Sequence, residues 1–101
     1  MHSAADAISL VTAERGAIQR LGVSRLGIFG SFARDAADAE SDLDVLVEFA
    51  PGKKTYDNLF DLGALLEGRC GRRVELVTMD SLSPHLGPKI LREARYVDLG
   101  H

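Results

Sequence analysis

A glycine–serine pair, Gly30-Ser31, joins an apolar run to a polar segment of the sequence. Glycine lets a ligand approach the backbone closely, because it has no Cβ to obstruct it. Serine at the start of a helix offers a hydroxyl, and the first turn leaves backbone N–H groups free at the positive end of the helix dipole. Phosphate groups bind at such helix starts. The pair therefore predicts a phosphate-binding site, with Ser31 near the N-cap of a short helix.

Two aspartates, Asp42 and Asp44, follow this pair after ten intervening residues. On a strand they project from the same face, with Cα atoms roughly 7 Å apart, and their charges repel each other. Two Mg²⁺ ions would compensate these charges, because Mg²⁺ prefers oxygen ligands and binds substrate phosphates at the same time. Phosphate-binding groups beside metal-binding carboxylates are the minimum equipment for phosphoryl or nucleotidyl transfer.

A third carboxylate, Glu75, is flanked by apolar residues in the segment 74–77. If this segment is a strand that pairs beside residues 42–49, Glu75 joins the two aspartates. It is then expected to ligate a metal, or to act as the base that accepts a proton from the attacking hydroxyl. The competing interpretation is structural: Ser31 only caps a helix, and Asp42 only starts a strand.

The elements that must position these residues alternate between helix and strand. Ser3 and Asp6 form a capping pair at the start of a first helix, and Gly22 ends it. Residues 42–49 alternate in hydrophobicity, which predicts a strand with four apolar side chains on one face: Leu43, Val45, Val47 and Phe49. Further strands are expected over 25–29 and 73–78, and further helices over 31–37, from 56 to Gly68 or Gly71, and from Pro88 onward. This order predicts a single α/β domain over residues 1–101.

The composition supports one compact domain and excludes several classes of protein. The chain has 101 residues, 46% of them hydrophobic, and a net charge of −3, which does not favour stable binding of nucleic acid. One cysteine, Cys70, excludes an internal disulfide and a multi-cysteine zinc site. No signal peptide is apparent, and no stretch approaches the ~18 apolar residues needed to cross a bilayer. We therefore expect a soluble cytoplasmic protein.

Three segments resemble the motifs of the minimal nucleotidyltransferase (MNT) family, within the DNA polymerase β-like nucleotidyltransferase superfamily. They are Gly-Ser-Phe-Ala-Arg at 30–34, Ser-Asp-Leu-Asp-Val-Leu-Val-Glu-Phe at 41–49 and Val-Glu-Leu-Val at 74–77. The resemblance implies a small mixed β-sheet covered by helices, similar to the polymerase β palm. It also implies that Gly30 and Ser31 bind the nucleotide phosphates and that Asp42 and Asp44 hold two Mg²⁺ ions. Arg34 is then either a further phosphate or partner contact or a solvated helix residue.

The same resemblance implies a partner and a substrate. Family members commonly act as the antitoxin of a neighbouring HEPN-type ribonuclease toxin, and some adenylylate a tyrosine of that toxin. We therefore expect transfer of AMP from ATP to a protein hydroxyl. One alternative is an antitoxin that occludes its toxin by contact and keeps only a weak or relict nucleotide site. Another is a small-molecule transferase whose acceptor pocket is completed by a second subunit.

Two residues depart from the family pattern, and two aromatic residues call for an interpretation. Glu75 stands where the family usually has Asp, so this carboxylate lies on a side chain one methylene longer. Asp35 follows Arg34 where the family favours Gly, which adds a negative charge near the expected phosphate site. Phe32, beside Ser31, is a candidate contact for the nucleoside, and Tyr56 is expected in the core or at its rim.

Overall fold

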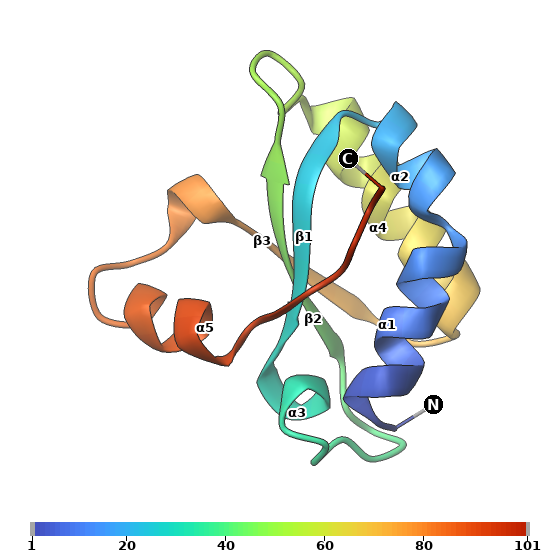
Figure 1. Ribbon diagram of the computed structural model, residues 1–101, viewed down its shortest axis with the longest axis vertical. Coiled ribbons are helices and arrows are strands. Elements are labelled where there is room, and N and C mark those ends of the chain that lie inside the picture. The colour runs from blue at the N-terminus through green and yellow to red at the C-terminus, as the bar shows by residue number, and fades with distance from the viewer. Residues whose placement is uncertain (1, 101) are drawn as a thin grey trace.

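The computed structural model describes residues 2–100. Figure 1 shows one sheet of strands with helices packed around it. The elements follow in the order α1 (Ala4–Ala13), α2 (Arg15–Arg20), β1 (Val23–Phe29), α3 (Gly30–Ala33), β2 (Leu43–Phe49), α4 (Tyr56–Cys70), β3 (Val74–Thr78), the 3₁₀ turn η1 (Met79–Ser81), α5 (Gly87–Glu93) and β4 (Arg95–Tyr96). No helix of this described part of the chain is long and apolar enough to span a membrane.

The sheet is mixed, and its strand order is β3-β2-β1-β4. Strand β1 pairs antiparallel with β2 and with β4, whereas β2 and β3 are parallel. The parallel pair is joined by α4, since parallel neighbours need a long crossover connection. The small mixed α/β sheet expected from the sequence is therefore confirmed.

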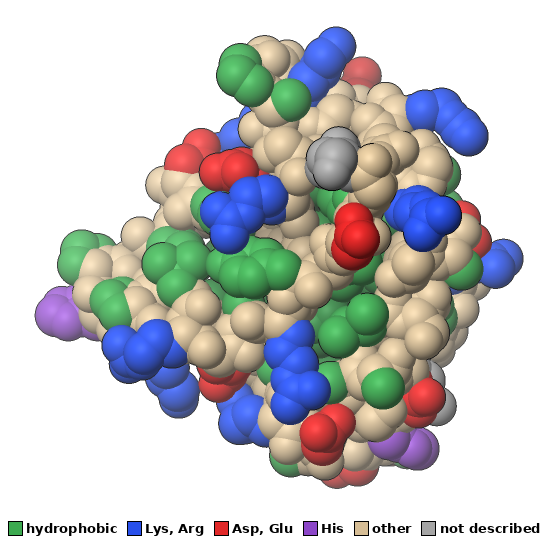
Figure 2. Space-filling model, in the orientation of Figure 1, with side chains coloured by type: hydrophobic (Ala, Val, Ile, Leu, Met, Phe, Trp, Pro, Cys, Tyr) green, Lys and Arg blue, Asp and Glu red, His purple; other side chains and the backbone are tan. Residues whose placement is uncertain are grey.

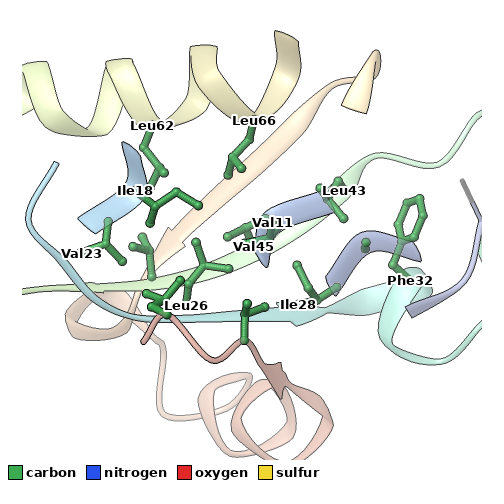
Figure 3. Close-up of a cluster of buried hydrophobic side chains, with 14 residues drawn as sticks. Val11, Ile18, Val23, Leu26, Ile28, Phe32, Leu43, Val45, Leu62 and Leu66 are labelled. Carbon is green, nitrogen blue, oxygen red and sulfur yellow. The ribbon is translucent and has the colours of Figure 1, made fainter. Parts of the chain in front are cut away.

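Three helices cover one face of the sheet, and α5 lies on the other side of the strands. Figure 1 shows α1, α2 and α4 together to the right of the strands and α5 to their left. The core forms between the strands and the first group of helices. Figure 3 shows Leu62 and Leu66 of α4 packed with Ile18 of α2 above strand residues that include Leu26 and Val45. All five of these side chains are fully buried.

The alternation in β2 determines which residues face this core. Leu43, Val45 and Val47 are fully buried in the cluster, as predicted, whereas Asp44 is only half-buried. Because side chains on a strand alternate between faces, Asp44 lies on the sheet face opposite the core. The strand begins at Leu43, so Asp42 lies just before it.

The first helix predicted to end at Gly22 is two helices in the structure. Ser3 caps α1 as expected, because its hydroxyl accepts a hydrogen bond from the Asp6 N–H at 3.1 Å. The chain leaves the helical conformation at Glu14, whose φ is −104° and whose carboxylate lies 2.7 Å from Nε of Arg69 in α4. Gly22 then adopts a positive φ of +84°, which suits glycine after a helix.

Helix α4 ends at Gly71 rather than Gly68, since Gly71 adopts a left-handed φ of +68°. The expectation for Tyr56 is wrong: it is the first residue of α4 and is 82% exposed. Two short elements have no counterpart in the sequence prediction, the turn η1 and the two-residue strand β4. Both are too short to produce a periodic hydrophobic pattern.

Candidate active site

Asp44 and Glu75 lie side by side on the two parallel strands. They are partners in the β2–β3 register, so the prediction that Glu75 joins the aspartates is confirmed for Asp44. Burial raises the pKa of Asp44 to about 6, with further contributions from the charge of Glu75, a hydrogen bond with the Glu75 side chain, and the charge of Asp42. Like charges held this close resist simultaneous ionisation, which is the electrostatic condition that a bound cation relieves.

Asp42 lies near these two residues, but an arginine holds its carboxylate. Its Oδ2 atom is 3.3 Å from the guanidinium of Arg73, which is itself 81% exposed. The two segments are also joined through the backbone, since the Leu43 N–H donates to the Arg73 carbonyl at 2.9 Å. Within residues 2–100, no three His, Cys, Asp or Glu side chains are arranged to hold a metal ion. The structure thus brings Asp44 and Glu75 together and leaves Asp42 in a surface ion pair.

Gly30 lies against the carboxylate of Asp44. Its φ is +70°, and a Cβ at this position would overlap Asp44 Oδ2. The two residues come together because Phe29, at the end of β1, is the register partner of Asp44. The sequence analysis interpreted this glycine as one that lets a ligand approach the backbone. In the structure, the group that approaches is the Asp44 side chain. Glycine is therefore needed here both for the backbone conformation and for space.

Ser31 is the second residue of α3 and does not cap it. The N-cap residue is Phe29, which makes no side-chain capping bond, so Ser31 lies near the N-cap, two residues after it. Helix α3 has only four residues. The Ser31 side chain is half-buried, and its hydroxyl makes no hydrogen bond within residues 2–100. A hydroxyl without a protein partner remains available to a ligand.

The sequence analysis missed Glu93, whose carboxylate accepts a hydrogen bond from the N–H of Gly30. Its Oε1 atom accepts a hydrogen bond from this N–H at 2.6 Å, and its Oε2 atom lies 3.0 Å from NH1 of Arg34. The N–H of Gly30, which precedes Ser31, is therefore already paired with a carboxylate of the protein. The one local signal for Glu93 is its place in the last turn of α5, where the helix dipole disfavours a carboxylate.

Phe32 and Asp35 both have structural roles, and that of Phe32 differs from the one expected. Phe32 is fully buried, with the guanidinium of Arg72 4.9 Å from its ring centroid, so it does not offer a surface to a nucleoside. Asp35 adopts a left-handed φ of +57°, which explains why glycine is favoured there. Its carboxylate accepts a hydrogen bond from the Ala4 N–H at 2.8 Å. The Asp35 charge thus stabilises the start of α1.

A cavity of about 320 Å³ opens beside Glu75, on the face of the sheet that carries the carboxylates. Its lining is mainly apolar and comes from β1, β3, η1, α5 and the loop before α5: Phe29, Glu75, Val77, Ser81, Leu82, Ser83, Leu86 and Ile90. Figure 2 shows hydrophobic side chains exposed on the α5 side of the molecule. A mainly apolar cavity with a carboxylate in its lining suits a side chain with an apolar body and a polar tip.

Sequence comparison places most of the chain in one family. The model of the nucleotidyltransferase domain matches residues 13–97. A relative from Methanocaldococcus jannaschii, named "putative protein adenylyltransferase", is 45% identical over 72% of this chain and 77% of its own length. Protein adenylyltransferase MntA from Thermococcus cleftensis is 37% identical over 88% of this chain and 90% of its own length.

Comparison with solved structures agrees. A structure described as "putative minimal nucleotidyltransferase" superposes with a TM-score of 0.73 and 39% identity, and covers 87% of this chain and 93% of that one. The MNT antitoxin in complex with a tri-AMPylated Shewanella oneidensis HEPN toxin shares the fold, with a TM-score of 0.56, 19% identity, and coverage of 83% of this chain and 68% of that one. The chain therefore belongs to the nucleotidyltransferase domain family and is an enzyme of the minimal nucleotidyltransferase type.

Proposed function

We propose that this chain is an antitoxin that transfers AMP from ATP, with Mg²⁺, to a hydroxyl of a HEPN-type toxin, most simply a tyrosine. The observation that carries the proposal is the pairing of Asp44 with Glu75 beside Gly30. In this proposal residues 1–101 act as one catalytic domain in the cytoplasm, and the toxin forms a hetero-oligomer with it.

The carboxylates fit a divalent cation in their chemistry. Asp44 and Glu75 offer only oxygen ligands and repel each other, and Mg²⁺ prefers oxygen ligands. Asp42 would complete the set after it leaves Arg73, because exposed ion pairs contribute only ~0–1 kcal/mol. When bound there, Mg²⁺ would neutralise phosphate charge and polarise the α-phosphate.

The chain's own residues then have separate tasks in the transfer. The free hydroxyl of Ser31 and the exposed guanidinium of Arg34 bind the β- and γ-phosphates. Glu75, which is exposed, accepts the proton of the acceptor hydroxyl. The hydroxyl oxygen forms a bond to the α-phosphorus, the bond from that phosphorus to the bridging oxygen breaks, and pyrophosphate leaves.

The acceptor is inferred from the cavity and from the relatives. The apolar cavity beside Glu75 suits an aromatic ring better than the short side chains of serine or threonine. MntA is named a protein adenylyltransferase, and the solved neighbour is bound to an AMPylated HEPN toxin. The cavity thus supports a tyrosine as the acceptor residue, and the relatives support a toxin as the acceptor protein.

A second candidate function, occlusion of the toxin by contact alone, is favoured by two observations. Asp42 is engaged by Arg73, and no metal-binding group of three residues is preformed among residues 2–100. The intact mass of the protein encoded beside this one, after incubation with ATP, Mg²⁺ and this chain, separates the two functions. Transfer adds one or more AMP units to that protein, whereas occlusion yields a stable complex of unchanged mass.

A further inference from the structure

The carboxylate of Glu93 connects the two ends of the segment 30–34. One oxygen accepts the Gly30 N–H at 2.6 Å, and the other lies 3.0 Å from NH1 of Arg34. Glu93 is about sixty residues away in sequence and reaches this segment from the end of α5. Both contacts are charge-assisted, which makes them about twice as strong as hydrogen bonds between neutral groups.

The exposure of the two side chains separates their roles. The Glu93 side chain is 16% exposed and that of Arg34 is 53% exposed. The carboxylate is thus largely covered, while the guanidinium keeps a surface that faces solvent. A guanidinium has five N–H donors, and NH1 makes the contact with Glu93, so donors remain for a ligand.

Glu93 occupies a position that is unfavourable for a carboxylate. It is the last residue of α5, where the helix dipole is negative, and it is largely desolvated. The Gly30 N–H and the Arg34 guanidinium compensate for this cost. An electrostatically costly residue with two partners at one functional segment is better explained by that segment than by the stability of α5.

We propose that Glu93 is a positioning residue for the nucleotide: it fixes the backbone at Gly30 and the guanidinium of Arg34 so that the segment 30–34 meets the phosphates of ATP in one conformation. The inference rests on the proposed function. Glu93 itself does not touch the nucleotide. Its contribution is to spare the ligand the entropy of ordering Arg34 and the turn at Gly30.

The test compares Glu93→Ala and Glu93→Gln with the wild type. Calorimetry without the partner gives the dissociation constant of ATP with Mg²⁺, and transfer assays with the partner give KM for ATP and kcat. We expect Glu93→Ala to raise the dissociation constant and KM about tenfold, with a smaller change in kcat. Glu93→Gln keeps an acceptor for Gly30 but loses the ion pair, so its effect should be intermediate. Glu93→Ala should have a smaller effect when it is added to Arg34→Ala than in the wild type, because part of its contribution acts through Arg34.

A matched control is Glu14→Gln. The Glu14 side chain is 18% exposed and pairs with Arg69 at 2.7 Å, but it lies among the helices α1, α2 and α4. We expect this variant to lose comparable stability and to bind ATP as the wild type does. If the role of Glu93 were merely structural, Glu93→Gln and Glu14→Gln would have the same affinity for ATP.

Amide hydrogen exchange at Gly30 supplies a readout independent of activity. It should accelerate in Glu93→Ala and stay unchanged in Glu14→Gln. Unchanged or tighter ATP binding in Glu93→Ala overturns the inference, and tighter binding would identify the carboxylate as a competitor of phosphate. If the wild type binds no ATP, the proposed function fails. In that case only one part of the inference remains, that Glu93 holds the segment 30–34 in one conformation. This part requires faster amide exchange at Gly30 in Glu93→Ala.

Discussion

Gly30 provides the space that the carboxylate of Asp44 fills, because a Cβ at residue 30 would overlap Asp44 Oδ2. The two residues are far apart in sequence and come together because β1 and β2 are antiparallel neighbours, with Phe29 opposite Asp44. A glycine that the sequence connects with phosphate binding therefore also determines where the carboxylate proposed for catalysis lies.

Substitution of Gly30 by alanine should displace Asp44 and strain the backbone. The φ of +70° costs a residue with a side chain roughly 1–2 kcal/mol, which urea denaturation would measure as lost stability. Transfer activity should fall by more than this loss of stability explains, because the carboxylate moves. Gly52 is a suitable control, since its φ is +78° and a Cβ there meets nothing within 4 Å. If Gly30→Ala and Gly52→Ala retain equal activity, Gly30 does not set the position of Asp44.

The raised pKa of Asp44 predicts a specific dependence of stability on pH. Its pKa is about 6 in the folded protein against an ordinary value of 3.8, so the folded state holds this proton more tightly than the unfolded state. The stability that protonation of Asp44 contributes is complete below the ordinary value and is lost as the pH rises through about 6. Asp44→Asn should remove this loss and be more stable than the wild type at neutral pH without divalent cations.

The measurement is the difference between the unfolding free energies of wild type and Asp44→Asn from pH 4 to pH 8. Taking the difference is necessary because other carboxylates, such as Asp38 and Asp80, have lowered pKa values and an opposite dependence. A difference that does not change with pH would show that Asp44 titrates normally. Added Mg²⁺ should reduce the difference at neutral pH, since a bound cation favours the ionised form.

Arg73 should compete with a divalent cation for Asp42. Replacing Arg73 by methionine removes an ion pair of 3.3 Å and keeps the backbone hydrogen bond from Leu43. We expect Mg²⁺ to activate transfer at a concentration about two- to fivefold lower, because an exposed pair is worth up to ~1 kcal/mol. Arg69→Met, which breaks the pair with Glu14, is the control and should leave the Mg²⁺ dependence unchanged. A weaker response to Mg²⁺ in Arg73→Met would instead assign Arg73 to the phosphates.

Glu75 should be needed for the chemical step and replaceable by aspartate. Glu75→Gln is expected to lower kcat by about 10²-fold or more while ATP still binds, because a proton acceptor is lost. Glu75→Asp should retain most of the transfer. Glu75→Gln should also lower the pKa of Asp44, since the charge of Glu75 is the largest cause after burial. Retention of full kcat in Glu75→Gln would exclude Glu75 as the base.

Asp35 should affect stability and not nucleotide binding. Asp35→Ala loses the acceptor for the Ala4 N–H and keeps a strained φ of +57°. The free energy of unfolding should therefore fall by about 1–2 kcal/mol. Asp35→Gly relieves the strain and should cost less. Thermal unfolding ranks the variants, and calorimetry with ATP should give one dissociation constant for all three proteins. Tighter ATP binding in Asp35→Gly would restore the view that its charge opposes the phosphates.

The strands and the carboxylates on them could be predicted from the sequence because their signals are local. The alternation through Leu43, Val45 and Val47 places Asp44 on the opposite face, and the apolar flanks of Glu75 mark a strand that only had to pair with β2. Glycines predicted the ends of helices for the same reason, as at Gly22 and Gly71.

The remaining features depend on contacts between distant segments. Glu93 contacts Gly30 across about sixty residues, and Arg73, the residue before β3, holds Asp42. The break between α1 and α2 falls at Glu14, two residues before Gly16, where Arg69 of α4 supplies an ion pair. Such contacts are fixed by tertiary structure, so a residue pattern does not reveal them.

The central claim, AMP transfer that depends on Asp44, is tested most directly with ATP labelled at either the α- or the γ-phosphate. The wild type and Asp44→Asn are each incubated with Mg²⁺ and the protein encoded beside this one. The account predicts label on that protein from α-labelled ATP only, with the wild type only, in a position released by phosphodiesterase. Label from the γ-phosphate, equal α-label with Asp44→Asn, or no label from a wild type that forms a stable complex would contradict it.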